Sequence, residues 1–251
     1  MFNDFSQTYP GWGLTHEIGH RMAVNVREYG EVTNNMVSMA MSIAYDKLDN
    51  RIPFEKMYNY LIAENNSVMN SLSLQERLGA FWQLELAHPG YWAQFNELYR
   101  EREVTLTNGD ISKQQYIIEF SSDVLQQDLS GYFARHGFTV TDETKQALKK
   151  YPTPKNIWYL NNSVVGYEGN GFTTDASVTV NVSRNEAKQT NTLTLTVDAL
   201  NKEHLLGYEI IRDGILIGFT STLTFVDQQV DPTENYHYEV IAYDKKLNVL
   251  K

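Results

Sequence analysis

The chain has 251 residues, of which 42% are hydrophobic and 21% are charged, a composition typical of a folded, soluble protein with one large domain or two small ones. Its 31 acidic and 21 basic residues give a formal net charge of −10, which argues against a nucleic-acid partner because there is no basic stripe for the phosphates. No stretch reaches the roughly 18 apolar residues that span a bilayer, and Met1 to Pro10 lack the basic start and apolar run of a signal peptide.

An amphipathic helix is predicted near the start of the chain. Apolar residues recur there every four positions, which gives the helix an apolar side formed by Leu14, Ile18, Met22 and Val26. Gly19 lies in the same segment, and because it has no side chain it permits a facing element to approach closely.

The same segment contains the run His16-Glu17-Ile18-Gly19-His20. Residues four apart share one face of a helix, so both imidazoles can reach a single ion. The chain has no cysteine, and any metal must therefore be held by His, Asp or Glu. Neutral imidazole is a good zinc ligand, and Glu17, directly after the first ligand, can accept a proton from a water at the metal. The alternative interpretation is a pair of surface histidines on an amphipathic helix.

A zinc site of this type needs a third protein ligand, for which two glutamates are candidates. Glu28 lies eight residues after His20, on the same or the adjoining turn. Gly30 then offers a break, after which residues 31–35 are predicted to open a second helix. A glutamate at the start of a returning helix can face the two histidines, so Glu31 is the predicted third ligand.

Helical periodicity continues to about residue 151. Apolar residues that recur three or four positions apart predict five further helical segments. They are a Met-rich segment over 32–48, a segment over 78–86 that ends at His88-Pro89-Gly90, segments over 95–102 and 110–120, and a short helix over 141–150 with lysines at its end.

Beyond residue 151 the periodicity becomes alternating, which predicts β-strands. The expected strands cover 177–182, 192–197, 207–212, 215–219 and 236–243. Asp213-Gly214 between two of them is a strong hairpin signal. Short strands at this spacing predict an antiparallel β-sandwich, and the last three resemble a fibronectin type III-like module.

The predicted fold class is therefore α + β in two domains. A mainly helical subdomain is expected over 1–154 and a fibronectin type III- or immunoglobulin-like β-sandwich over 173–251. Residues 155–172 contain two candidate strands, 157–160 and 164–167, between Asn- and Gly-rich breaks, and are interpreted as a connector.

Two segments carry a resemblance to a known family. Residues 13–20, Gly-Leu-x-His-Glu-Ile-Gly-His, and residues 30–35, Gly-Glu-Val-Thr-Asn-Asn, resemble the enhancin-like zinc metallopeptidases of gluzincin type. The resemblance continues through 77–84 and 128–133 and covers about 140 residues. Many peptidase families share the two-histidine motif, and the second segment is the more discriminating one.

The resemblance implies that His16, His20 and Glu31 hold Zn²⁺ and that Glu17 is the general base of peptide-bond hydrolysis. The family includes viral enhancins and bacterial proteases that attack mucins, so it implies a glycoprotein or mucin-like substrate and a secreted or cell-surface protein. Its catalytic domains have a substantial segment before the zinc helix, whereas fifteen residues precede His16 here. The chain is therefore expected to be the C-terminal part of a longer protein.

Asn35 stands four residues after Glu31, on the same face of the predicted helix. It could hydrogen-bond a ligand histidine and fix its tautomer, as residues behind a metal ligand often do. The alternative is an asparagine that caps or lines the helix. Asn34 is less well placed for this role.

Other polar and aromatic residues have two interpretations each. A donor that stabilises the oxyanion is expected, with Tyr132, His136 and Asp123 as candidates, although each of them is more often structural. Trp158 and Tyr167 could bind sugar by stacking, or they could pack in a core or an interface.

The predicted function is that of a zinc-dependent endopeptidase acting on glycoproteins. The alternative is a truncated, catalytically weak zinc-binding fragment that acts as an adhesion or glycan-binding module.

Overall fold

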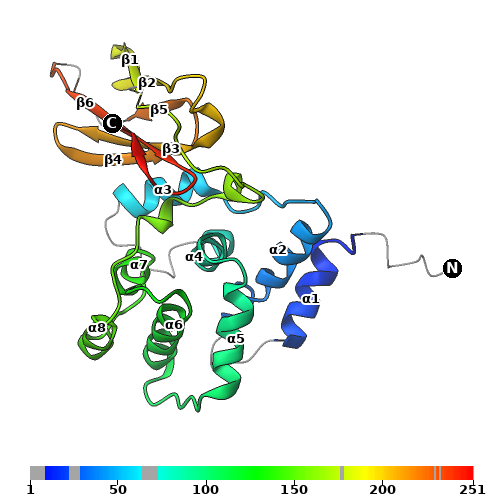
Figure 1. Ribbon diagram of the computed structural model, residues 1–251. Coiled ribbons are helices and arrows are strands. Elements are labelled where there is room, and N and C mark those ends of the chain that lie inside the picture. Colours follow the sequence, from blue (N-terminus) through cyan, green and yellow to red (C-terminus); the bar gives the residue numbers. More distant parts are fainter. Residues whose placement is uncertain are drawn as a thin grey trace. The chain divides into compact units, whose positions relative to one another are not determined.

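The structure is a computed structural model that describes residues 9–22, 29–63, 73–175, 178–228, 230–231 and 233–250. The chain divides into two compact units, 1–54 with 66–158 and 55–65 with 159–251 (Figure 1). Among the described helices, none is long and apolar enough to cross a membrane. The expected domain limits at residues 154 and 173 stay a prediction.

The first unit is built from helices, as the periodicity predicts. They are α1 (Trp12–Met22), α2 (Asn35–Ala44), α4 (Leu74–Ala87), α5 (Tyr91–Glu101), α6 (Gly109–Leu125), α7 (Ser130–Arg135) and α8 (Asp142–Leu148). Helix α4 ends directly before His88-Pro89-Gly90, and Thr141 caps α8 by accepting a hydrogen bond from the Thr144 amide at 3.3 Å. Helix α1 packs on α2, and α5 packs on α6.

Large apolar side chains fill the core of this unit. Met36 and Met39 of the Met-rich segment are buried, as the stripe predicted over 32–48 requires, but α2 ends at Ala44 and Leu48 at the end of the stripe is 36% exposed. Trp82, Phe95 and Phe133 are also fully buried, so that aromatic rings from α4, α5 and α7 contribute to one helical core.

Helix α1 differs from its prediction in which side is buried. Leu14, Ile18 and Met22 are 49%, 41% and 56% exposed, whereas Thr15 and Gly19 are buried. The reason is that α2 approaches α1 along its small residues, so the apolar side predicted from the four-residue spacing faces away from the core of the unit. Val26, the fourth residue of that series, lies outside the described residues.

Helix α2 begins later than predicted. Residues 30–34 form turns, and the hydrogen bonds from the Asn35 amide to the Val32 carbonyl and from the Met36 amide to the Thr33 carbonyl are both 3.1 Å long. These turns, each closed by a hydrogen bond between residues three apart, lead into the first α-helical residue, Asn35. Glu31 therefore projects from the turn before the helix rather than from its first turn.

The second unit contains a two-sheet β-sandwich. One sheet has the order β1-β2-β5 and the other β4-β3-β6-β7, and all paired strands are antiparallel. The strands are β1 (Thr179–Asn185), β2 (Thr190–Thr196), β3 (Leu205–Arg212), β4 (Ile215–Thr220), β5 (Thr224–Asp227), β6 (Tyr238–Asp244) and β7 (Val249–Leu250). Leu193 and Leu195 of the first sheet share a core with Ile210 and Ala242 of the second.

The predicted hairpin lies at Asp213-Gly214. Both residues have positive φ angles, 51° and 80°, as a type I′ turn requires, and Arg212 pairs with Ile215 across it. The strand predicted over 192–197 is β2. Residue 177, the first of the series predicted over 177–182, lies outside the described residues, and β1 begins at Thr179. The resemblance to fibronectin type III stays a prediction.

The two strands predicted in the connector are wrong. The structure has short 3₁₀ helices there, η2 (Ile157–Tyr159) and η3 (Asn162–Val164). Side chains satisfy the local carbonyl groups in place of a partner strand: Gln83 donates to the Trp158 carbonyl at 2.6 Å within the first unit. A short apolar run has no periodicity that separates a strand from a buried turn, which explains the error.

Helix α3 (Phe54–Ala63) was not predicted from the sequence. From Glu55 onward it belongs to the second unit. Its Tyr58 ring lies 4.8 Å from Phe219 of β4, and the Tyr58 hydroxyl donates to the Tyr159 carbonyl at 2.7 Å. Tyr159 in turn stacks on Phe219 with ring centroids 3.9 Å apart. Helix α3 is thus joined to the sandwich by an aromatic cluster.

Candidate metal centre

The geometry of the centre depends on how α1 packs against α2 and the turn before it. The Thr15 hydroxyl lies 3.0 Å from the Ser38 hydroxyl, and a Cβ atom at Gly19 would lie only 2.2 Å from the carbonyl oxygen of Asn34. A residue with a side chain does not fit at Gly19, which agrees with the close approach predicted for it. This contact fixes the turn of α1 from which His16 and His20 project.

Three side chains converge beside this contact. His16 Nε2 lies 3.0 Å from one carboxylate oxygen of Glu31, and His20 Nε2 lies 3.3 Å from the other. One ligand atom from each of the three residues lies within 4.8 Å of the others, and among the described residues this is the one such His, Asp and Glu group that could hold a metal. Glu28, the other glutamate considered, lies outside the described residues.

Asn35 fixes the orientation of the first histidine. Its Oδ1 atom lies 2.7 Å from His16 Nδ1, while its Nδ2 atom donates to the Glu31 carbonyl at 2.7 Å. Because Nδ2 is committed as the donor, Oδ1 acts as an acceptor, and His16 Nδ1 must carry the proton. In the neutral imidazole the lone pair of His16 then resides on Nε2, the atom that faces Glu31.

This donor set fits a divalent cation such as zinc. With its lone pair on Nε2, His16 faces a carboxylate oxygen at 3.0 Å, and both atoms are acceptors. Two acceptors at that separation repel one another, and a positive charge between them, that of a metal ion or of a proton on Nε2, removes the repulsion. Two imidazole nitrogens and one carboxylate are also the ligand set of many catalytic zinc sites.

Glu17 and Asn34 flank the three residues in different ways. Glu17 is exposed and makes no hydrogen bond with another described residue. Asn34 is 2% exposed, and its side-chain nitrogen lies 3.1 Å from His20 Nε2 and 3.2 Å from His16 Nε2. From the sequence, Asn34 was considered less well placed than Asn35 to contact a histidine, because a helix was predicted to start at residue 31. In the observed turn both Asn34 and Asn35 face the histidines.

The three oxyanion candidates make their contacts elsewhere in the helical unit. The Tyr132 hydroxyl donates to the Ala80 carbonyl at 2.5 Å, and Asp123 forms an ion pair with Arg102 at 2.5 Å. Burial opposes ionisation of Asp123, but hydrogen bonds from Tyr151 and Arg102 outweigh it and hold the pKa of that carboxyl below its usual value.

His136 is the third of these candidates. It is 1% exposed, and burial lowers its pKa to about 3, with the positive charge of Arg135 acting in the same direction. Neither ring nitrogen has a hydrogen-bond partner in the described part of the chain. His136 is therefore a neutral core residue next to the ring of Tyr132, at a centroid distance of 4.6 Å.

The two aromatic residues considered for sugar stacking are held by neighbours. Trp158 is 6% exposed and lies under the guanidinium of Arg135, 4.2 Å from its ring centroid. The Tyr167 hydroxyl contacts His204 Nδ1 at 2.5 Å and accepts from the Gly171 amide at 3.0 Å. Both arrangements agree with the packing interpretation.

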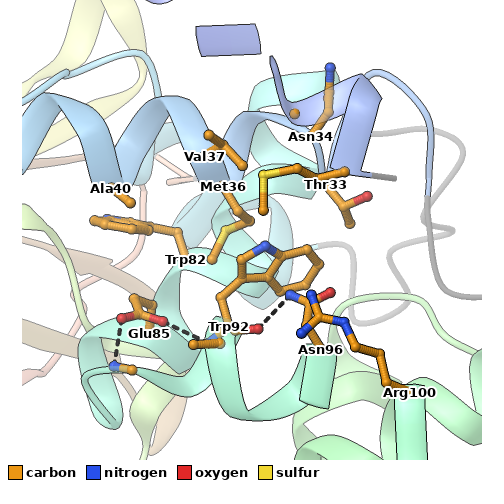
Figure 2. Close-up of a pocket in the computed structure, with 14 residues that line it drawn as sticks. Thr33, Asn34, Met36, Val37, Ala40, Trp82, Glu85, Trp92, Asn96 and Arg100 are labelled. Atoms are coloured by element: carbon orange, nitrogen blue, oxygen red, sulfur yellow. Dashed lines mark hydrogen bonds between the residues drawn. The ribbon is translucent and has the colours of Figure 1, made fainter. Parts of the chain in front are cut away.

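A cavity of about 320 Å³ adjoins the centre and is lined by residues of α1, α2, α4 and α5 (Figure 2). Met36 and Trp92 give it apolar walls, and Asn96 and Arg100 add polar groups. The Asn96 amide donates to the Trp92 carbonyl at 2.5 Å, whereas its buried Oδ1 has no partner among the described residues. On the other side, His16 and Glu31 line a cavity of about 120 Å³ with Trp12 and Arg51.

The family model of peptidase M60, enhancin and enhancin-like, matches residues 1–137. The chain belongs to this family. The metal centre described above, from His16 to Asn35, lies within the matched segment, as do α4 to α7.

Solved structures of M60 proteins share the fold over almost the whole chain. The CBM32-1, CBM32-2 and M60 catalytic domains of Clostridium perfringens ZmpB are 36% identical with a TM-score of 0.87, and the match covers 96% of this chain and 26% of that one. The ZmpB metallopeptidase of the same organism is 36% identical with a TM-score of 0.85, and the match covers 96% of this chain and 49% of that one. The M60 catalytic domain of Clostridium perfringens ZmpC, in complex with the sialyl T antigen, is 33% identical with a TM-score of 0.86. The match covers 96% of this chain and 49% of that one.

The chain thus spans about a quarter to a half of the length of these M60 structures. A comparison with curated proteins gave no match.

Proposed function

We propose that the protein is a zinc-dependent endopeptidase that hydrolyses peptide bonds in glycoproteins. The observation that carries the proposal is the convergence of His16, His20 and Glu31, with Asn35 behind His16. Membership of the M60 family supports metallopeptidase chemistry.

In this proposal His16 and His20 bind zinc through Nε2 and Glu31 binds it through a carboxylate oxygen. When bound, zinc polarises the scissile carbonyl and makes water more acidic. Asn35 keeps the proton of His16 on Nδ1, at 2.7 Å, and so keeps Nε2 available to the metal. It also holds the turn that carries Glu31 through the Glu31 carbonyl, at 2.7 Å.

Glu17 is the proposed general base. It follows the first proposed ligand directly on α1, is exposed, and makes no hydrogen bond with another described residue that would occupy its carboxylate. It can therefore take the proton of an attacking water and pass it to the leaving amine. The position of Glu17 on the same turn as His16 is what brings the base to the metal.

A glycoprotein substrate is supported by the relatives. The M60 catalytic domain of ZmpC was solved in complex with the sialyl T antigen. The cavity of about 320 Å³ next to α1 combines an indole with amide and guanidinium groups, which suits a substrate with both apolar and polar parts (Figure 2). We place the reaction in a secreted or cell-surface protein.

The test combines metal binding with cleavage. Chelator-treated protein is titrated with Zn²⁺, and one equivalent is expected to bind; His16→Ala should abolish this binding. Glu17→Gln should keep zinc binding and lose any hydrolysis of a mucin. Mucin cleavage that persists at an unchanged rate in Glu17→Gln contradicts the assignment of the base.

Because the chain spans only part of its relatives, we expect zinc binding to be complete and hydrolysis by these 251 residues to be weak. Substrate positioning needs more of a cleft than the ligands alone supply. Zinc binding together with mucin binding, but no cleavage by this chain or by a longer form of the protein, would favour the alternative of a glycan-binding module.

A further inference from the structure

Three residues of α5 line the cavity of about 320 Å³ that adjoins the metal centre. They are Trp92, Asn96 and Arg100, and because they are spaced four apart they lie along one side of the helix. Together they bring an indole, an amide and a guanidinium to one wall. Figure 2 shows the Arg100 side chain running back along α5 towards the Trp92 ring. The chemistry proposed at the metal uses none of these groups.

Arg100 is a cation without a partner in the described part of the chain. Its exposed side chain makes no hydrogen bond, ion pair or ring contact there, and its acidic neighbours on α5, Glu97 and Glu101, form no ion pair with it. Arg102, two residues further along, is by contrast paired with Asp123 at 2.5 Å. A guanidinium stays charged and has five N–H donors. Arg100 is therefore available to an anion from outside the chain.

The cavity also contains a carboxylate, that of Glu85, but both of its oxygens are already engaged. They accept hydrogen bonds from the Gly90 and Trp92 amides, at 2.7 and 2.8 Å, where α5 begins. The N-terminus of a helix stabilises a negative charge at that position. Arg100 lies eight residues further along, and no ion pair joins it to Glu85. The positive charge of Arg100 is therefore not cancelled within the cavity.

Trp92 gives the cavity a fixed apolar wall. Its ring stacks on Phe95, with centroids 5.3 Å apart and an angle of 18° between the planes, and meets Phe81 nearly at a right angle at 6.1 Å. Met36 of α2 is fully buried and adds a second apolar surface. An aromatic ring that is held in place packs against a sugar ring or an aliphatic chain with little loss of conformational entropy.

The size and polarity of the cavity restrict what it can bind. Ligand pockets in proteins measure about 300–1,000 Å³, so a cavity of about 320 Å³ admits one sugar ring or one side chain. A group that suits it has an apolar part for Trp92 and an acidic end for Arg100. A carboxylate matches the guanidinium well, because its two oxygens accept two parallel hydrogen bonds.

We propose that this cavity binds a carboxylate-bearing group of the substrate, and that Arg100 is the residue that selects for its charge. The proposal rests on the proposed function, because it takes the group to be part of a glycoprotein substrate. The carboxylate then belongs either to an acidic sugar or to an acidic side chain. Gly19 and Asn34, which lie beside the two histidines, also line the cavity, so a group bound there is held next to the metal centre.

Direct binding to the full chain, supplied with one equivalent of Zn²⁺, tests the selection for charge. Binding is followed by the NMR signal of the Trp92 indole N–H, assigned with Trp92→Phe, because this group reports on the cavity itself. One pair of probes is N-acetylneuraminic acid and its methyl ester, and the other is N-acetylglutamate amide and N-acetylglutamine amide. The acid of at least one pair should bind about tenfold or more tightly than its neutral counterpart, as a charge-assisted hydrogen bond provides. The pair that shows the preference identifies the source of the carboxylate.

Four variants assign the preference to a residue. Arg100→Gln should weaken binding of the acid by about 10- to 100-fold and leave binding of the neutral probe unchanged. Arg100→Lys keeps the charge without the planar fork and should retain part of the preference. Arg102→Gln, the matched control, removes the neighbouring paired arginine and should keep it in full. His16→Ala should lose Zn²⁺ and still prefer the acid. Thermal unfolding of each variant verifies that it is folded.

Several results would overturn the inference. Equal binding of acid and neutral probes would do so, as would the lack of any shift of the Trp92 signal with all four probes. A preference that survives in Arg100→Gln but is lost in His16→Ala would show that the carboxylate binds the metal and not Arg100. If the wild type binds no Zn²⁺ but keeps a preference that depends on Arg100, the cavity is confirmed as a carboxylate site and the proposed function alone fails.

Discussion

Replacing Gly19 by alanine tests the contact between α1 and α2 on which the metal centre depends. The new Cβ atom would lie 2.2 Å from the Asn34 carbonyl oxygen, 2.8 Å from its carbon and 2.9 Å from the Asn34 Cβ. Contacts between carbon and oxygen atoms settle at about 3.3 Å or more. Since the nearest atoms belong to the backbone, the two segments must separate by about 1 Å, the difference between that contact and the distance available.

Two opposing terms set the magnitude. Alanine favours a helix over glycine by about 1 kcal/mol, whereas overpacking costs about 1–3 kcal/mol and more where backbone must move. We therefore expect a net loss of about 1–2 kcal/mol in the free energy of unfolding. Metal sites accept deviations of about 0.2 Å in ligand distance, so a displacement of about 1 Å between α1 and the turn with Glu31 should weaken zinc binding by at least about tenfold.

The assay measures thermal unfolding in chelator and zinc affinity by competition. Gly13→Ala is the matched control, because Gly13 lies on the same helix and has no atom within 4 Å of the site of an added Cβ. It should leave zinc affinity unchanged and stabilise the fold by up to about 1 kcal/mol. If Gly19→Ala behaves like Gly13→Ala in both measurements, the close approach does not position the metal centre.

Three further outcomes are expected. Asn35→Ala should weaken zinc binding by about 10- to 100-fold, measured by competition, with little change of unfolding temperature in chelator, since it frees the His16 tautomer. Folding lowers the pKa of His136 from 6.5 to about 3. Below about pH 6.5 this histidine therefore gains a proton in the unfolded protein but stays neutral in the folded protein. The free energy of unfolding falls as the pH is lowered from about 6.5 towards 3, by about 2 kcal/mol at pH 5. His136→Phe should flatten the dependence of the unfolding free energy on pH in that range, measured in chelator, and an unchanged slope would contradict the assignment. The fragment 173–251 should unfold at a lower temperature than a protein that also contains residues 55–65 and 159–172, because the fragment lacks the Tyr58 and Tyr159 rings that pack on Phe219. Equal unfolding temperatures would refute this.

Local patterns predicted the parts of the fold that depend on neighbours in sequence. The stop at His88-Pro89-Gly90 and the turn at Asp213-Gly214 follow from the conformations that proline and glycine permit, and the structure has both. The alternation over 192–197 likewise marks β2, whose Leu193 and Leu195 point into the core. Helix α3 and the connector could not be predicted in this way, because aromatic contacts distant in sequence determine them.

The same distinction holds within the candidate metal centre. The spacing of His16 and His20 is local, and it predicts a shared helical face without any knowledge of α2. Whether Glu31 or Glu28 faces them depends on the path of the chain after Gly30, which spacing alone left open. Asn34 was ranked below Asn35 for a related reason, because its contacts with the two imidazole rings depend on the turns over 30–34, which the spacing did not predict.

Helix α1 shows why an apolar stripe is a poor guide to how a catalytic helix packs. Its small residues Thr15 and Gly19 face α2, because histidines that must meet a glutamate on the neighbouring turn require the two backbones to be close. Burying Leu14 and Ile18 against α2 instead would hold the backbones farther apart and rotate His16 and His20 away from Glu31. The large residues are therefore excluded from this contact by the geometry of the metal centre. The exposure of Leu14 and Ile18, 49% and 41%, is the consequence within this unit.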